Sequence, residues 1–154
     1  YFVAQFLGAY VGAVIVWFVW KDHLDEEPEA RAKLGVFATA PSIRNPLRNC
    51  LAEAVATFSL MFIILSLSHM QPAGGVALFF VFAGVAGGVM AFAGLTGYAI
   101  NPARDLAPRI VHAMLPIRGK GDSDWSYAWV PVVGPMIGGA AAGLLYNVLF
   151  RWHL

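Results

Sequence analysis

A short polar sequence, residues 101 to 109, directly follows a long stretch without charge. No aspartate, glutamate, lysine or arginine occurs from residue 54 to 103, and Arg104, Asp105 and Arg109 then follow. An arginine at the edge of such an apolar stretch is costly to bury and marks a candidate functional site in a membrane protein. It offers a fixed positive charge and several hydrogen-bond donors. No paired nucleophile and base accompany it, so the sequence predicts no enzyme.

The residues around Asn101 predict the start of a helix. Asn101 precedes a proline and is a favoured N-cap residue, and Pro102 suits the first helical position. A helix over 102–115 would be about 21 Å long, too short for a bilayer core of about 30 Å. Such a half-helix would point its positive dipole end, with Arg104, at a buried or water-lined space. The alternative is a helix on the membrane surface, and composition alone leaves both open.

The composition predicts an integral membrane protein. Apolar residues make up 59% of the 154 residues and charged residues 12%, whereas soluble domains carry about 25% charged residues. The net charge of +1 gives no reason to expect a nucleic-acid partner. Cys50 is the only cysteine in the sequence, which excludes an internal disulfide. No side chains at metal-ligand spacing predict a metal or another cofactor.

Four apolar segments are long enough to cross a bilayer: residues 2–20, 47–68, 73–93 and 128–150. A charged loop interrupted by prolines is expected between the first two, over residues 21–46, outside the bilayer. Glycines four residues apart occur in these segments, as at 134 and 138 and at 139 and 143. Such pairs let helices approach closely in lipid, so they predict a tight all-α bundle.

The motif NPAR, Asn101 to Arg104, resembles the second signature of the aquaporin, or major intrinsic protein, family. Its context, LTGYAINPARDLAPRI, resembles the glycerol-conducting aquaglyceroporin branch, and most of all the bacterial glycerol uptake facilitators. The first residues, YFVAQFLGAYVGA, resemble the third transmembrane helix. The resemblance implies a right-handed helical bundle, here helices three to six with the second re-entrant half-helix. Because the family has two such motifs and this chain one, the first half-helix and helices one and two are expected before Tyr1.

The resemblance also implies roles for individual residues. Asn101 would donate its side-chain amide to a hydroxyl of the passing solute, and Arg104 would be the arginine of the selectivity constriction. Pro102 and Ala103 complete the motif. Tyr98 falls where the family places an aromatic or a backbone-contributing residue of the same constriction.

Four further positions resemble the glycerol branch more than the water channels: Asp105, Arg109, Pro131 and Val132. Asp105 also lies four residues before Arg109, a spacing that favours an ion pair on one helix face. Val89 stands where water channels often carry histidine and glycerol channels usually glycine. This valine departs from both patterns and leaves the pore width open.

Glu53 is the one acidic residue inside an expected span. In the family, a glutamate at the matching place holds the irregular backbone before the motif, and a carboxylate is a good acceptor for several N–H groups. The alternative is an interfacial residue near the end of its span. The sequence GVFAT resembles the loop whose carbonyls line the outer vestibule, which assigns Phe37, Ala38 and Thr39 to that vestibule.

The charge distribution and the resemblance disagree on orientation. Nine of the ten lysines and arginines lie on the side of the two long connections, and only Arg151 lies on the other. The positive-inside rule would make the first side cytoplasmic, whereas the resemblance makes residues 21–46 extracellular. We adopt the second orientation because nearby acids offset most of these charges and the segment that usually sets orientation would precede Tyr1.

The predicted function is a passive, multi-pass channel of the cell membrane for glycerol and similar small neutral solutes, with some water. The resemblance further implies a homotetramer in which each subunit carries its own pore. A water-selective aquaporin is the alternative within the same class. A non-conducting packing subunit of a membrane complex is the alternative from a different class.

Overall fold

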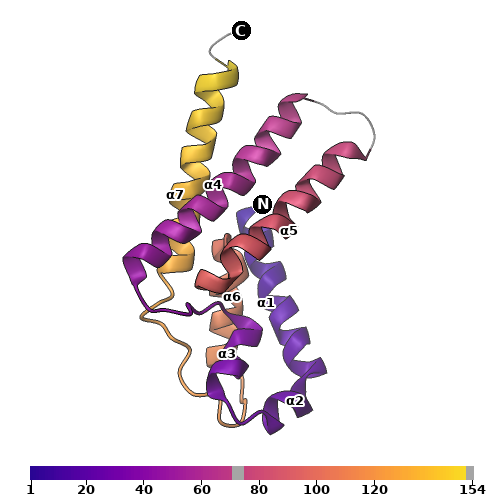
Figure 1. The fold of residues 1–154 in the computed structure, drawn as a ribbon. Helices are drawn as coiled ribbons and strands as arrows, with labels where there is room; N and C mark the ends of the chain where they lie inside the picture. The colour runs from indigo at the N-terminus through magenta and orange to yellow at the C-terminus, as the bar shows by residue number, and fades with distance from the viewer. Residues whose placement is uncertain (71–74, 152–154) are drawn as a thin grey trace.

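The computed structural model describes residues 1–70 and 75–151, and over those ranges it contains helices and connecting loops but no strand (Figure 1). The long helices are α1 (Phe2–Val19), α4 (Pro46–Met70), α5 (Val76–Thr96) and α7 (Val130–Tyr146), which continues as a turn of π-helix, Asn147–Arg151. The short helices are α2 (Lys21–Glu26), α3 (Ala30–Phe37) and α6 (Pro102–Met114). The architecture is therefore all-α, as predicted.

Within residues 1–70 and 75–151, four helices are long and apolar enough to cross a membrane: Phe2–Val19, Pro46–Met70, Val76–Thr96 and Val130–Phe150. Part of the expected third span, residues 73 and 74, lies outside the described residues. The range 21–46, expected as a loop, contains two short helices. The second of these, α3, has Glu29 as its N-cap, and the Glu29 carboxylate accepts a hydrogen bond from the Arg31 N–H at 3.4 Å. This N-cap stabilises a helix in a range whose charges and prolines had predicted a loop.

The closest helix pair is α4 with α7, which lie side by side in Figure 1. An added Cβ at Gly134 would lie 2.7 Å from Glu53 Cβ, and one at Gly138 would clash with the Ala54 carbonyl. These two glycines therefore allow the α4 and α7 backbones to touch, as glycines do in helix pairs within lipid. The next pair, Gly139 and Gly143, has no atom within 4 Å of an added Cβ, so its spacing does not mark a contact among the described residues.

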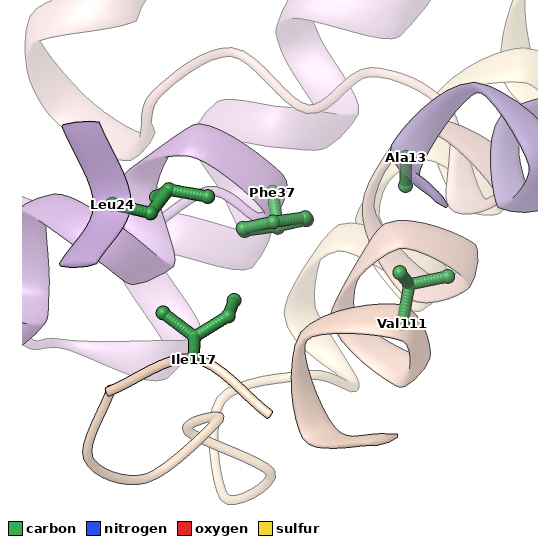
Figure 2. Close-up of a cluster of buried hydrophobic side chains, with 5 residues drawn as sticks. All are labelled: Ala13, Leu24, Phe37, Val111 and Ile117. Carbon is green, nitrogen blue, oxygen red and sulfur yellow. The ribbon is translucent and has the colours of Figure 1, made fainter. Parts of the chain in front are cut away.

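A cluster of buried apolar side chains packs several segments of the chain against one another (Figure 2). Its buried members come from α1, α2, α3, α6 and the connection after α6: Ala13, Leu24, Phe37, Val111 and Ile117. Lys120 covers the nearby end of α6 by donating to the carbonyl oxygens of His112 (2.7 Å), Ala113 (2.7 Å) and Leu115 (2.6 Å). A cation at a helix C-terminus satisfies free carbonyls and opposes the helix dipole. The apolar cluster and the Lys120 hydrogen bonds therefore both hold the C-terminal end of α6 in place.

The helices α1 and α5 present apolar side chains outward. On α5 the residues Phe79 (65% exposed), Phe82 (70%) and Met90 (88%) have little cover from the described part of the chain. So large an apolar surface is typical of a face that meets lipid or another protein segment. The short α6 lies between α1 and α7 (Figure 1) and contacts both.

Candidate functional site

The break between α5 and α6 is the centre of the site. Helix α5 ends at Thr96, where Gly97 takes a left-handed conformation with φ of 82°, and α6 begins at Pro102. Tyr98 and Ile100 also have positive φ, at 58° and 48°. Each such non-glycine residue costs about 1–3 kcal/mol of strain. The segment 97–101 therefore needs contacts elsewhere in the molecule to hold its shape.

The Glu53 carboxylate on α4 supplies those contacts. Its Oε1 accepts hydrogen bonds from Thr96 Oγ1 at 2.6 Å and from the Ala99 N–H at 3.0 Å, and its Oε2 accepts one from the Ile100 N–H at 2.7 Å. Glu53 is only 1% exposed. Charged acceptors make stronger hydrogen bonds than neutral ones, so this carboxylate offsets the strain of the turn. Glu53 contacts the backbone segment that the resemblance assigned to it.

Asn101 caps α6. Its Oδ1 accepts a hydrogen bond from the Ala103 N–H at 2.9 Å, which satisfies one of the free amides of the first turn. With the oxygen used in this way, the amide nitrogen points away from the helix, and Nδ2 donates to Gln5 Oε1 on α1 at 3.3 Å. The amide group of Asn101 is therefore oriented with its oxygen toward α6 and its donor toward α1.

Three of the predicted pore residues border one cavity of about 360 Å³, here called the inner cavity. It is lined by Val85, Ala93, Gly97, Tyr98, Ala99, Ile100, Asn101 and Arg104. Arg104 is exposed, whereas Ala103 is 2% exposed and packs into the protein, and Pro102 is half-buried at the first position of α6. The inner cavity thus combines an amide donor, a guanidinium and the N-terminus of a helix.

The ring of Tyr98 is turned toward α5. The residue is 6% exposed, its ring stacks on Phe92 with a centroid distance of 6.4 Å, and its hydroxyl lies against Gly88. A side chain at position 88 would collide with this ring. The geometry therefore favours a backbone contribution of Tyr98 to the inner cavity over an aromatic wall.

Asp105 and Arg109 form a buried ion pair on α6, and both side chains are 0% exposed. Arg109 Nη2 lies 2.8 Å from Asp105 Oδ1, and Arg109 Nε donates to the same oxygen at 2.9 Å. The Asp105 Oδ2 accepts from the Thr39 N–H at 2.7 Å and from Thr39 Oγ1 at 2.6 Å. Arg109 also donates to the carbonyls of Thr39 at 2.9 Å and Ser123 at 2.7 Å. The pair ties α6 to both long connections.

A second cavity, of about 260 Å³ and here called the outer cavity, is also lined by Arg104. It is lined by Arg31, Gly35, Ala38, Thr39, Ala40, Gly97 and Arg104. Ala38 and Thr39, two of the three predicted vestibule residues, therefore share a cavity with Arg104. The third, Phe37, is 2% exposed and packs in the apolar cluster, 5.5 Å from the His112 ring.

The remaining predicted residues lie apart from both cavities or are not described. Pro131 is buried and Val132 half-buried in the first turn of α7, and neither lines the inner or the outer cavity. Val89 lies in α5, and its side chain lies outside the described part of the structure.

Several contacts of the site were not predicted from the sequence. Gln5 accepts a hydrogen bond from Asn101, and Thr96 donates one to Glu53. The Ser123 carbonyl accepts a hydrogen bond from Arg109, and the Ser123 hydroxyl lies 2.8 Å from His112 Nδ1. The role of Gln5 could have been predicted, because it is the one amide side chain in the uncharged residues 1–20. An amide in an apolar span usually finds a polar partner on another helix.

The chemistry available here is hydrogen bonding and electrostatics. The inner cavity offers donors from Asn101 and Arg104, together with the positive end of the α6 dipole. Among residues 1–70 and 75–151, no group of three or more His, Cys, Asp or Glu side chains could hold a metal ion. The arrangement suits a neutral solute that accepts hydrogen bonds and disfavours a cation.

Comparisons with known proteins agree on one family. A family model described as "Major intrinsic protein" matches residues 1–146. An uncharacterized aquaporin-like protein of Haemophilus influenzae is 57% identical over 150 residues, which cover 97% of this chain and 70% of that protein. A glycerol uptake facilitator protein of Bacillus subtilis is 49% identical over 155 residues, which cover 100% of this chain and 56% of that protein.

A solved structure is similar as well. The X-ray structure of the aquaglyceroporin from Plasmodium falciparum matches with a TM-score of 0.72 and 26% sequence identity, and the match covers 99% of this chain and 64% of that one. The chain therefore spans between 56% and 70% of the length of these three proteins.

Proposed function

Because this chain belongs to the major intrinsic protein family, we propose that the full-length protein is a passive membrane channel for glycerol and similar small neutral solutes, with some water. The chain itself is a multi-pass membrane protein with four helices of sufficient length and apolarity to cross a bilayer. The observation that carries the proposal is the inner cavity, where Asn101, Arg104 and the backbone of Tyr98 meet at a broken helix.

Selectivity in this channel comes from donors and charge. A solute that leaves bulk water gives up hydrogen bonds, and the Asn101 amide and the Arg104 guanidinium replace them for a hydroxyl oxygen. A monovalent cation receives no such compensation. At 4 Å from Arg104 it meets a repulsion of about 4 kcal/mol for an effective dielectric constant near 20. The positive end of the α6 dipole adds to this barrier.

The names of related proteins support glycerol over water as the main solute. The Bacillus subtilis relative is a glycerol uptake facilitator, and the Plasmodium falciparum structure is an aquaglyceroporin. The buried Asp105–Arg109 pair adds support, since these residues were the sequence markers of the glycerol branch. A water-selective channel is the second candidate within the class.

We further propose the cell membrane as the location, residues 21–46 as an extracellular connection, and a homotetramer with one pore per subunit as the assembly. These proposals rest on the family resemblance. The mass of the detergent-solubilised protein, with bound detergent subtracted, tests the assembly, because a monomer or dimer contradicts it.

The test of the channel function uses the full-length protein in vesicles. Stopped-flow light scattering after mixing with an inward glycerol gradient reports glycerol permeability, and mixing with an impermeant sugar reports water permeability. We expect the rate of glycerol entry to be well above that of protein-free vesicles. Water flux without glycerol flux would favour the water-selective candidate, and neither flux would favour a non-conducting packing subunit.

A further inference from the structure

The outer cavity has an unusual charge balance. Of the residues that line it, only Arg31 and Arg104 are charged, and both are cations. Neither guanidinium has a carboxylate within 4.0 Å among residues 1–70 and 75–151, where the ion pairs are Lys21–Asp25, Arg44–Asp124 and Arg109–Asp105. Among the described residues, no acid lines this cavity and neither of its two cations takes part in an ion pair.

The outer cavity also lies between two others. It shares Gly97 and Arg104 with the inner cavity, and it shares Arg31 and Ala40 with a third cavity of about 440 Å³ that opens at the charged end of the molecule. This third cavity, here called the surface cavity, contains both acids and bases, among them Glu29, Asp122 and Asp124. Arg31 therefore lines both the surface cavity and the outer cavity, and Arg104 lines both the outer cavity and the inner cavity.

The position of Arg31 is set by the backbone around it. Its Nη2 donates to the Pro41 carbonyl at 2.6 Å, which holds the guanidinium against the segment that follows α3. Gly35 follows Arg31 by four residues, so both lie on one face of α3. Ala38 comes directly after the last residue of this helix, and all three residues line the outer cavity. This hydrogen bond therefore holds the Arg31 guanidinium at a cavity that Ala38 and Thr39 also line.

We propose that Arg31 is a second charge-selectivity residue, which makes the outer cavity electropositive and rejects cations before they reach Arg104. The role of Arg31 in rejecting cations rests on the proposed channel function. The positive potential of the outer cavity does not depend on that function. Arg44 provides a matched comparison, since it lines the surface cavity only and is paired with Asp124. That carboxylate raises the pKa of the Arg44 guanidinium, as expected for an ion pair.

The potential can be measured with a reporter thiol at position 35. An added Cβ at Gly35 has no atom within 4 Å, so Gly35→Cys fits in the full-length protein in which Cys50 and any other native cysteine are replaced by serine. The reporter is treated with two methanethiosulfonate reagents, one carrying a sulfonate and one a trimethylammonium group. We expect the anionic reagent to react faster, and Arg31→Gln to lower the anion-to-cation rate ratio at least about threefold, as removal of one nearby charge should.

The control and the salt dependence separate charge from structure. Arg44→Gln should leave the rate ratio unchanged, and the effect of Arg31→Gln should shrink between 0.01 M and 0.1 M salt, since the screening length falls from about 30 Å to about 10 Å. An equal effect of both substitutions, no effect of Arg31→Gln, or no reaction with either reagent overturns the proposal.

The role in selectivity is tested by uptake of labelled guanidinium into vesicles. In an Arg104→Val background, adding Arg31→Gln should raise guanidinium permeability at least about threefold, whereas adding Arg44→Gln should not. Equal uptake with and without Arg31→Gln, zero included, contradicts the proposal. A wild-type protein that passes no glycerol contradicts the channel function instead, and the thiol rate ratio still decides whether Arg31 makes the cavity electropositive.

A second pair of variants keeps the proposal testable if Arg31→Gln does not fold. Position 35 has open space around an added Cβ, so Gly35→Glu and Gly35→Gln can be compared in the same Arg104→Val background. The two side chains are similar in size and differ in charge. We expect the glutamate to neutralise the field of Arg31 and to raise guanidinium uptake above that of the glutamine variant. Equal uptake by the two variants overturns the proposal.

Discussion

Replacing Glu53 with glutamine should close the channel without unfolding the protein. The new side chain has the same length and the same Cβ, so the close contact of position 53 with Gly134 is unchanged. One amide oxygen can keep the bonds from Thr96 and Ala99, but the amide N–H₂ group then faces the Ile100 N–H, which is a donor as well.

The cost can be worked from these three hydrogen bonds. An unsatisfied buried N–H costs about 1–3 kcal/mol, and the loss of charge weakens each of the other two bonds by about 1 kcal/mol. The sum is about 3–5 kcal/mol. The strain at Tyr98 and Ile100 that these bonds offset is about 2–6 kcal/mol for the two residues together. Because the two quantities are similar, the segment 97–101 should relax and Asn101 should leave its orientation.

The assay is glycerol permeability of vesicles that contain equal amounts of each protein. We expect Glu53→Gln to lower it at least about tenfold, which corresponds to about 1.4 kcal/mol of the cost. Circular dichroism should still report the helices. Glu26→Gln is the control, since Glu26 is exposed and outside the apolar helices. A folded Glu53→Gln protein with the glycerol permeability of the wild type refutes the reasoning.

Two further substitutions test the packing and the buried ion pair. Gly138→Ala should lower the thermal unfolding temperature in detergent by several degrees, because the new Cβ meets the rigid Ala54 carbonyl, whereas Gly139→Ala should leave it unchanged; equal melting temperatures contradict the packing. Asp105→Asn should destabilise the protein by about 3–5 kcal/mol, because it leaves the Arg109 charge buried and unpaired. The double substitution Asp105→Asn with Arg109→Met should recover part of the loss in the same melting assay, and a double variant less stable than Asp105→Asn contradicts the account.

Local rules of sequence account for the start of α6. Asn101 as N-cap and Pro102 as first helical residue follow from backbone preferences of two adjacent residues, and the structure has both. The partners of Asn101 and Asp105 could not be found in this way. Gln5 lies 96 positions before Asn101 and Thr39 lies 66 positions before Asp105, so only the packing of the whole bundle brings them together.

The four-residue spacing of glycines predicts which residues share a helix face, but it does not predict whether another helix packs on that face. Two glycines four residues apart share a face whether or not another helix meets it. Gly134 and Gly138 meet α4, while Gly139 and Gly143 meet no described atom. The charge content of residues 21–46 hid α2 and α3 for a related reason, since short helices depend on caps such as Glu29 and on burial of residues such as Phe37.

The most direct test asks whether Arg104 faces a water-filled passage that glycerol uses. Arg104→Cys is introduced into the full-length protein in which Cys50 and any other native cysteine are replaced by serine, and the variant is reconstituted into vesicles. Glycerol flux is recorded before and after treatment with a bulky, water-soluble thiol reagent. The account predicts that complete labelling reduces glycerol flux to the level of protein-free vesicles. Complete labelling with unchanged glycerol flux would place Arg104 outside the passage and contradict the central claim.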